Sequence, residues 1–506
     1  MLVADVLIVG AGPTGLVLAL WLKRQGVGAR IVDKSAGPGE TSRALAVQAR
    51  TLELYRQVGL AEPVITAGHK VPAMNVWARG KHRARVVFGD AGAGVSPYPF
   101  ALVYPQDHHE RLLVETLQAL GVAVERNTEL LDFEDNGDGV TARLRLPDGN
   151  EETAKFRYLA GCDGASSTVR NTLDLGFEGG TYKHVFYVAD VELGGLEAID
   201  EGHVALEGGD SILVLPYDAW GKARLVGTVQ DARAEHADSL TFADVDQDAA
   251  SSLGLRIDKV NWFSTYRVHH RVADTFRRGR VFLLGDAAHI HSPVGGQGMN
   301  TGILDAINLA WKLADVLQRR APDALLDTYA TERMAFARTL VNTTDRAFTL
   351  VTSESAIANF VKTHIAPQVA SLAYRFRSLG RLLFETVSQT TLDYRESALS
   401  AGKAGEVQGG DRLPWVKVGS EDNFAPLPDI GWELHVYGAV QPDVTAWCGA
   451  RGIGLRAFAW TQAHGRAGLA RDAAYLVRPD GYVGFADPEG SVAALAGYFD
   501  ALGYRG

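Results

Sequence analysis

Cysteine is scarce in this sequence, since the 506 residues include two, Cys162 and Cys448. Two cysteines cannot build a disulfide framework, and no CxxC pair or Cys/His cluster is present to hold a structural zinc. His289 and His291 could be read as a metal pair, but no cluster of carboxylates or cysteines accompanies them. We therefore expect a protein of the reducing cytoplasm without a bound metal.

An excess of basic residues is also missing, because the net charge is −10. Binding to nucleic acid needs a basic face, so nucleic acid is not an expected partner. Residues 6–22 are uncharged, but they contain three glycines and a proline and lack a basic segment before them. They predict a strand, a turn and a helix rather than a membrane span or a signal sequence.

Several catalytic motifs are absent as well. The sequence has no GxSxG turn for hydrolase chemistry, and His109-Glu110 begins like HExxH but has Leu113 in place of the second histidine. A second GxGxxG motif is also missing. This argues against a separate nicotinamide-binding Rossmann domain and against enzymes of the disulfide-reductase type, which carry two.

The first motif that is present lies at the beginning of the chain. A buried strand over Val3–Val9 is followed by Gly-Ala-Gly-Pro-Thr-Gly at 10–15, a helix to about Gln25, and a second strand that ends at Asp33. In a βαβ unit, glycines at this spacing allow the backbone to approach a pyrophosphate at the helix N-terminus. The acidic residue at the end of the second strand accepts hydrogen bonds from ribose. The pattern predicts a dinucleotide site.

Two later stretches have the same character. Asp163-Gly164 follows a strand and precedes a helix capped near Ser166 or Ser167, which indicates either close approach to a ligand or an N-cap turn. Residues 279–302 place Asp286 after a buried strand, then a glycine-rich loop, then an amphipathic helix from about Met299. A carboxylate followed by bare backbone amides suits a large, polyhydroxylated, phosphate-bearing ligand.

The length of the chain predicts two or three domains. Alternating patterns predict strands in the middle, helices follow to about residue 394, a glycine-rich connector covers 401–411, and strands and helices alternate thereafter. The predicted fold is multidomain α/β and α+β. Its parts are a Rossmann-like domain over 1–182 and 271–400, a β-rich substrate domain over 183–270 with segments from about 69–105, and a C-terminal α/β domain over 408–506.

Together, GAGPTG at 10–15, CDGASSTVR at 162–170 and GDAAHIHSPVGGQGMNTG at 285–302 resemble the group A flavoprotein monooxygenases. These are FAD-dependent aromatic hydroxylases with the p-hydroxybenzoate hydroxylase fold, and the resemblance covers about residues 1–395. It implies that NADPH or NADH reduces FAD transiently, that O2 adds at flavin C4a, and that the hydroperoxide hydroxylates a phenolic or polyketide aromatic. Baeyer–Villiger oxidation, epoxidation or oxidative decarboxylation with the same flavin remain open. So does a non-enzymatic binding role, as in the Rab GDP-dissociation inhibitors.

The resemblance also implies residue roles. The first motif holds the FAD diphosphate, Asp33 binds the AMP ribose where the family usually has Glu, and Asp286 binds the ribityl chain. The implied cofactor-binding residues are Gly10, Gly12, Pro13, Thr14, Gly15, Asp33, Lys34, Arg43, Gln106, Asp163, Gly164, Asp286, Pro293, Gly296, Gly298, Met299 and Asn300. The loop implied to act on the flavin ring through its backbone consists of Pro293, Gly296, Gly298, Met299 and Asn300.

Two further expectations concern the substrate and the tail. Tyr104, Tyr217, His269 and His270 are candidates for the substrate pocket, with ordinary sheet packing as the alternative. The tail resembles the thioredoxin-like C-terminal domain of the longer family members, chiefly through LVRPDGYVGFAD at 476–487. Since the CxxC of thioredoxin is absent, the resemblance implies packing or a homodimer contact rather than redox activity.

Overall fold

The computed structural model describes residues 4–39, 44–78, 80–194, 200–207, 210–218, 221–229, 240–245, 253–291, 296–352, 377–425 and 430–505. A six-stranded sheet forms its centre, in the order β18-β19-β12-β1-β2-β8. The strands are β18 (Arg277–Arg278), β19 (Val281–Leu283), β12 (Tyr158–Gly161), β1 (Val6–Val9), β2 (Ala29–Asp33) and β8 (Val124–Arg126). All pair in parallel except β18.

The apolar run at the start of the chain explains the middle of this sheet. All four residues of β1 are buried, as expected for a parallel strand covered on both faces. Two of the covering helices are α1 (Pro13–Arg24) and α9 (Gly298–Leu317), which contribute long rows of buried residues to the same core. The predicted strand, turn and helix over 3–25 are confirmed for the described residues.

Shorter elements surround the parallel sheet. The helices are α2 (Ala49–Gln57), α3 (Ala61–Ala67), α4 (Phe88–Ala91), α5 (Gln106–Ala119) and α6 (Thr168–Thr172). One antiparallel sheet consists of β9 (Glu129–Asp135), β10 (Val140–Arg145) and β11 (Glu151–Phe156), and another of β3 (Ala46–Val47), β7 (Ala101–Val103) and β4 (His69–Val71).

An eight-stranded sheet forms the second large layer, in the order β20-β17-β13-β16-β15-β14-β5-β6. Its strands are β20 (His289–Ile290), β17 (Arg256–Ala273), β13 (Phe177–Gly194), β16 (Lys222–Val229), β15 (Asp210–Pro216), β14 (Gly202–Glu207), β5 (Ala73–Ala78) and β6 (Lys81–Val87). β13 leads the chain out of the parallel sheet and β17, antiparallel to it, leads back. The stretch 279–302 therefore joins both sheets, through β19 and β20.

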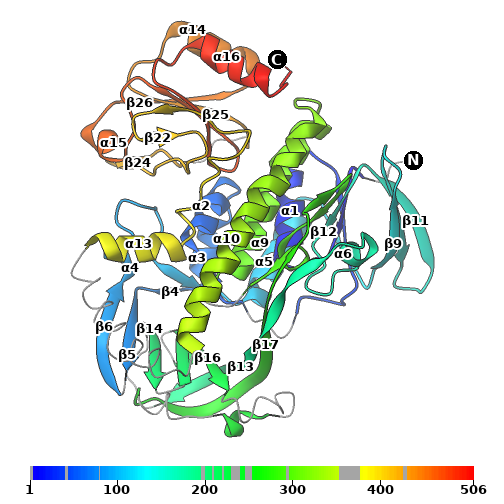
Figure 1. The fold of residues 1–506 in the computed structure, drawn as a ribbon, viewed down its shortest axis with the longest axis vertical. Coiled ribbons are helices and arrows are strands. Elements are labelled where there is room, and N and C mark those ends of the chain that lie inside the picture. The colour runs from blue at the N-terminus through cyan, green and yellow to red at the C-terminus, as the bar shows by residue number, and fades with distance from the viewer. Residues whose placement is uncertain are drawn as a thin grey trace.

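The rest of the chain includes another six-stranded sheet, which lies at the opposite end of the molecule from the eight-stranded one (Figure 1). Helices α10 (Asp327–Thr352) and α13 (Arg377–Val387) come first. The sheet order is β22 (Val407–Gln408), β21 (Ala401–Ala404), β28 (Val483–Asp487), β27 (Ala474–Val477), β25 (Glu433–Tyr437) and β26 (Gly454–Phe458). Residues expected as a connector over 401–411 thus include two strands of this sheet, of which β22 is at its edge. Helices α14 (Pro442–Arg451), α15 (Gln462–Arg466) and α16 (Val492–Ala501) and the small β23 (Lys417–Val418) and β24 (Glu421–Asp422) pair complete this part.

The described residues contain neither a membrane-spanning helix nor a cluster of metal ligands. None of their helices is long and apolar enough to cross a membrane. The same residues contain no group of three or more His, Cys, Asp or Glu side chains placed to hold a metal ion.

Candidate functional site: the carboxyl edge of the parallel sheet

The three motifs meet at one edge of the parallel sheet. Since β1, β12 and β19 run in the same direction, the residues that follow them lie together. Backbone bonds join these ends, from Cys162 N to Val9 O at 2.7 Å and from Leu284 N to Gly161 O at 3.0 Å. Segments about 150 and 280 residues apart in sequence therefore build one site.

The glycines of the first motif have distinct structural reasons. Gly10 has φ +101°, and a Cβ there would overlap the carbonyl group of Cys162. A Cβ at Gly15 would overlap the Gly10 carbonyl in the same way. At Gly12, by contrast, a Cβ would meet no described atom within 4 Å, so this side of the turn is open. Among the described residues, no side chain caps the N-terminus of α1. Open space beside uncapped helix amides fits a diphosphate.

Thr14 joins the first motif to the third. Its Oγ1 would lie 2.8 Å from a Cβ at Gly285, and a Cβ at Gly302 would overlap it. Side chains at either glycine would push Thr14, and with it the turn, out of place. This contact fixes the beginning of α1 against the Gly285 turn and against α9.

Asp33 lies beside the same turn. Its Oδ2 accepts a hydrogen bond from Ala11 N at 2.6 Å, and its Oδ1 accepts one from Ser35 N at 2.7 Å. Arg126 Nη1 lies 3.6 Å from the same carboxylate, and the neighbouring Lys34 is exposed. The carboxylate thus supports the glycine turn while it stays half-buried at the edge of the site.

Gln106 is the first residue of α5, and its Nε2 donates to Glu110 Oε1 at 2.8 Å. Burial raises the pKa of Glu110, which the hydrogen bond from Gln106 opposes. Gln106 N also donates to Ala44 O at 3.3 Å. Arg43, predicted to contact the flavin together with Gln106, lies outside the described residues.

Asp163 has an internal role. Its carboxylate accepts hydrogen bonds from Ser167 Oγ at 2.6 Å and from Val169 N at 3.1 Å, at the beginning of α6. Ser167 is the N-cap of that helix, as one of the two expected positions. Burial raises the pKa of Asp163, and Gly164 has φ +78°. These bonds agree with the N-cap alternative for the carboxylate, and its contact with FAD remains a prediction.

Asp286 differs from the residues around it. Residues 281–285 and 287–289 are buried, whereas Asp286 is exposed at the edge of the sheet. His289, in contrast, is buried and pairs with Asp305 at 2.7 Å. The carboxylate of Asp286 thus lies at the surface of this edge, whereas the His289 imidazole is paired in the interior. The role of Asp286 in binding the ribityl chain stays a prediction.

Asp305 and Arg333 were missed by sequence reasoning. Asp305 is fully buried; its Oδ2 accepts from Gly285 N at 2.9 Å, and its Oδ1 accepts from Arg333 Nε at 2.6 Å. Burial would raise the pKa of Asp305, but Arg333 and His289 outweigh burial and lower it. A signal was available, because Asp305 is a lone acid in the apolar run Gly-Ile-Leu-Asp-Ala-Ile. The Asp305–Arg333 pair thus holds the Gly285 turn from the buried side.

The loop before α9 is held by Asn300. This fully buried side chain donates to Ala46 O at 2.8 Å and to Gly296 O at 3.0 Å, and accepts from Gln48 N and from Thr51 Oγ1. Four of the residues predicted to act on the flavin ring lie together at the start of α9, namely Gly296, Gly298, Met299 and Asn300, and their role stays a prediction. Pro293 lies outside the described residues.

The candidate substrate residues lie apart. Tyr217 is on the eight-stranded sheet, hydrogen-bonded to Asp190, which also binds Arg224 Nε at 2.8 Å. Its ring packs against a cluster that contains Val103, the residue before Tyr104.

Tyr104 is buried and its hydroxyl donates to His108 O at 3.1 Å. His269 pairs with Thr181 Oγ1 at 2.7 Å, and burial lowers its pKa. His270 packs against the ring of Tyr182. Internal contacts thus account for these three side chains as they do for Tyr217, and Tyr104 is the candidate that packs in the core of the parallel sheet.

A cavity of about 550 Å³ borders the flavin-ring loop. Its lining includes Gln297, Phe336 and Leu340 of α10, and several residues between 386 and 397. Tyr104, Tyr217 and His269 are not among its described lining residues.

Comparisons with known proteins bear on the family and the fold of the chain. The family model described as "FAD binding domain" matches residues 3–344. The chain is 38% identical to 6-methylpretetramide 4-monooxygenase of Streptomyces rimosus over 402 residues, which cover 79% of this chain and 71% of that protein. It is 32% identical over 497 residues to a flavin-dependent monooxygenase of Mycobacteroides abscessus, with 95% and 96% covered. The solved structure of OxyS anhydrotetracycline hydroxylase from Streptomyces rimosus matches with a TM-score of 0.78 and 29% identity, over 99% of both chains.

Proposed function

Because this chain belongs to the FAD binding domain family and is a flavin-dependent monooxygenase, we propose that its substrate is a phenolic or polyketide aromatic that it hydroxylates with NAD(P)H and O2. The resemblance to aromatic hydroxylases inferred from the three motifs is confirmed, as is the mixed α/β fold with an FAD-binding domain. The observation that carries the proposal is the meeting of the three motifs at one edge of the parallel sheet.

The residues of this edge fit FAD. The open side of the 10–15 turn, at the N-terminus of α1, would hold the diphosphate, Asp33 the ribose, and Asp286 the ribityl chain. When bound, FAD supplies the redox chemistry, taking electrons from the nicotinamide and activating O2. The backbone at 296–300 would orient the ring, and Asn300 keeps that backbone in one conformation.

The substrate proposal has two supports. Named relatives act on tetracycline precursors and on pentachlorophenol. The cavity beside Gln297 lies within the range of about 300–1,000 Å³ typical of organic ligand sites, which favours a multi-ring substrate. Tyr104, Tyr217 and His269 remain our candidates for a substrate contact outside this cavity.

The test is consumption of NADPH and NADH by the FAD-loaded protein against a panel of phenols and polyketide aromatics, with product masses. We expect coenzyme use to rise with a substrate and the product to gain one oxygen atom. A ring-expanded lactone would point instead to Baeyer–Villiger oxidation. A protein that stays colourless after FAD is supplied would overturn the proposal.

We further propose that residues 408–506 form a thioredoxin-like domain without redox activity. The arrangement β25-α14-β26 followed by β27-β28-α16, with β25 between β26 and β27, supports this fold. Burial raises the pKa of Cys448 to about 11, which disfavours a reactive thiolate. The division into domains given above, a homodimer and a cytoplasmic location belong to the same proposal, and sedimentation would test the dimer.

A further inference from the structure

A tight turn in the C-terminal part packs against helices of the FAD-binding part. It consists of Arg478-Pro479-Asp480-Gly481. It joins β27 to β28, and Gly481 N donates to Arg478 O at 2.8 Å. Arg478 and Asp480 are each 2% exposed, although they lie at the tip of a hairpin. The turn contacts three helices, α10, α9 and α2, and on each helix the contact lies close to a residue that holds the flavin site.

On α10 the residue that contacts the turn, Glu332, is next to the residue that holds the Gly285 turn, Arg333. Glu332 receives two hydrogen bonds from the Arg478 guanidinium, at 2.8 and 2.9 Å. The next residue, Arg333, donates to Asp305 at 2.6 Å and to Thr301 O at 3.1 Å. A shift of α10 that breaks the first contact therefore also disturbs the anchor of the Gly285 turn and the first turn of α9.

On α9 the same helix carries both contacts. Asn308 Nδ2 and Trp311 Nε1 donate to Asp480 Oδ2 at 3.2 and 3.1 Å. Two to three turns earlier, Asn300 of this helix closes the flavin-ring loop by its bonds to Gly296 O and Ala46 O. Asp480 therefore fixes the middle of the helix whose N-terminus faces the flavin ring.

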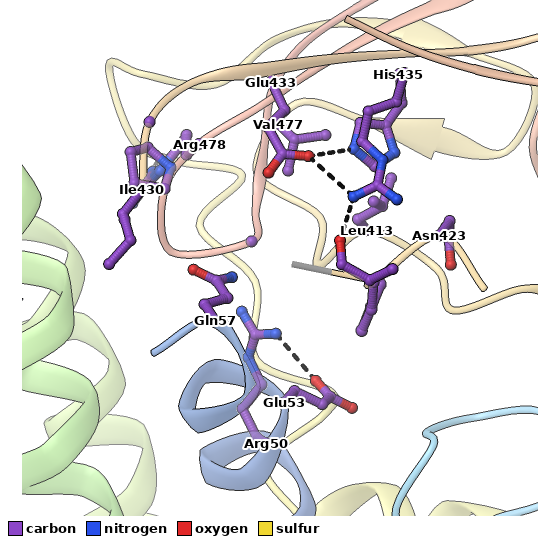
Figure 2. Close-up of a pocket in the computed structure, with 16 residues that line it drawn as sticks. Arg50, Glu53, Gln57, Leu413, Asn423, Ile430, Glu433, His435, Val477 and Arg478 are labelled. Atoms are coloured by element: carbon purple, nitrogen blue, oxygen red, sulfur yellow. Dashed lines mark hydrogen bonds and ion pairs between the residues drawn. The ribbon is translucent and has the colours of Figure 1, made fainter. Parts of the chain in front are cut away.

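On α2 the residue that contacts the turn, Arg50, is next to Thr51, which binds Asn300. Arg50 Nη2 donates to Asp480 O at 2.5 Å, and Thr51 Oγ1 donates to Asn300 Oδ1 at 2.8 Å. Arg50 is also paired with Glu53 on the same helix at 3.0 Å. Figure 2 shows Arg50 and Glu53 on α2, below Arg478 and other C-terminal residues that line a small cavity.

The charges in this contact are balanced. The buried cations Arg478 and Lys312 pair with the buried anions Glu332 and Asp480. Arg50, which is also buried, pairs with Glu53. Burial would raise the pKa of Glu332, but Arg478 and Lys312 outweigh it and hold the pKa well below its usual range. Removing one member leaves an uncompensated charge in the interior, so the helices must move or admit water.

We propose that Arg478 and Asp480 are positioning residues for FAD: the C-terminal turn fixes α2, α9 and α10 so that these helices hold the flavin-ring loop and the Gly285 turn. The proposal rests on the FAD site and not on the identity of the substrate. It gives the LVRPDGYVGFAD segment a role in cofactor binding although the segment is on a different sheet from the cofactor.

The test compares Arg478→Met with Arg456→Met in the full chain. Arg456 is also mostly buried, but its contacts, with Ala425, Glu433 and Phe458, are confined to the C-terminal part. FAD titration without substrate and thermal unfolding are measured for both variants. We expect both to unfold at lower temperature, and Arg478→Met alone to raise the Kd for FAD about tenfold. An unchanged Kd in folded Arg478→Met would overturn the proposal.

Arg478→Lys covers the case in which Arg478→Met does not fold. It keeps the charge but replaces a two-armed donor with a single ammonium group. We expect a folded protein whose Kd for FAD rises by a smaller factor, with a changed flavin fluorescence. Wild-type affinity in this variant would refute the positioning role. A wild-type protein that binds FAD but oxidises no aromatic would refute the proposed function and leave this inference standing.

Discussion

The two tight turns at 10–15 and 478–481 both contain glycine and both follow a strand. They differ in whether their polar groups have partners within the protein. The first exposes bare backbone, with open space at Gly12 and a helix N-terminus that no described side chain caps. The second pairs the charges of its buried Arg478 and Asp480 side chains. Backbone amides at the edge of a sheet that have no protein partner indicate a ligand site, because a ligand can accept their hydrogen bonds. Polar side chains whose hydrogen bonds are all made within the protein indicate a structural contact.

The largest expected effect comes from Gly10→Ala. The new Cβ would overlap the Cys162 carbonyl at a backbone with φ +101°, so β1 and β12 must separate or the turn must change. We expect the apoprotein to lose about 3 kcal/mol or more of unfolding free energy. Urea unfolding of the apoprotein measures this. Near-wild-type stability would mean that the turn is less tightly packed than described.

Gly12→Ala separates ligand binding from folding in the same turn. Since its Cβ enters open space, the apoprotein should lose about 1 kcal/mol or less, from the weaker helix cap. The methyl group would occupy the space proposed for the diphosphate, so FAD affinity should fall about tenfold or more. Calorimetric titration with FAD, alongside apoprotein melting, checks both. Normal FAD binding by Gly12→Ala would contradict the placement of the diphosphate beside Gly12.

Asp286→Ala should have a smaller effect on the same ligand. The side chain is exposed, so the apoprotein should keep its stability, while the loss of ribityl hydrogen bonds should weaken FAD binding about tenfold. The flavin retained after gel filtration is the measurement. Asp305→Asn is the contrasting variant, because it removes a buried charge from Arg333 and should lower the melting temperature. Full FAD occupancy in Asp286→Ala would contradict its assigned role.

The remaining effect is on acid stability rather than on FAD binding. It concerns His109, on α5, whose Nε2 is hydrogen-bonded to Tyr55 of α2, the helix that turn 478–481 contacts through Arg50. Burial lowers the pKa of His109 to about 4, below its unfolded value of about 6.5. The unfolded chain therefore takes up the proton first as pH falls, so stability present above pH 6.5 is lost toward pH 4. Between pH 7 and pH 5 the loss should be about 2 kcal/mol.

His109→Gln is the variant that isolates this contribution. Glutamine can still donate to Tyr55 but does not titrate, so the slope of stability against pH should flatten between pH 7 and pH 5. Urea unfolding of the apoprotein at several pH values gives the slope. An unchanged slope would assign the acid sensitivity to other groups.

Much of the first turn could be predicted from the sequence, because its causes are local. Glycine spacing, the buried strand before it and Asp33 after the second strand all act within the first 33 residues. The position of Asp286 at the same edge also followed, since it ends a buried strand. That β12 lies between β1 and β19 is a matter of sheet order, which strand patterns do not determine.

The second turn could not be predicted in the same way, because its causes are distant. Arg478 and Glu332 are 146 residues apart, and nothing near either residue indicates its partner. Asp305 and Arg333 present the same difficulty at a separation of 28 residues. A charge within an apolar helix shows that a partner must exist, but only the packing of α9 on α10 selects which one.

The separation of Arg478 from its partners also sets an order of events during synthesis. Helices α2, α9 and α10 leave the ribosome long before residues 476–487, with Glu332 and Lys312 on a surface that still lacks its cover. If Arg478 and Asp480 position the FAD site as proposed, the nascent chain reaches its full affinity for FAD only after the C-terminal hairpin is made. A ribosome stalled before residue 478 would therefore carry a chain that captures FAD poorly, even though all three nucleotide motifs have already been translated.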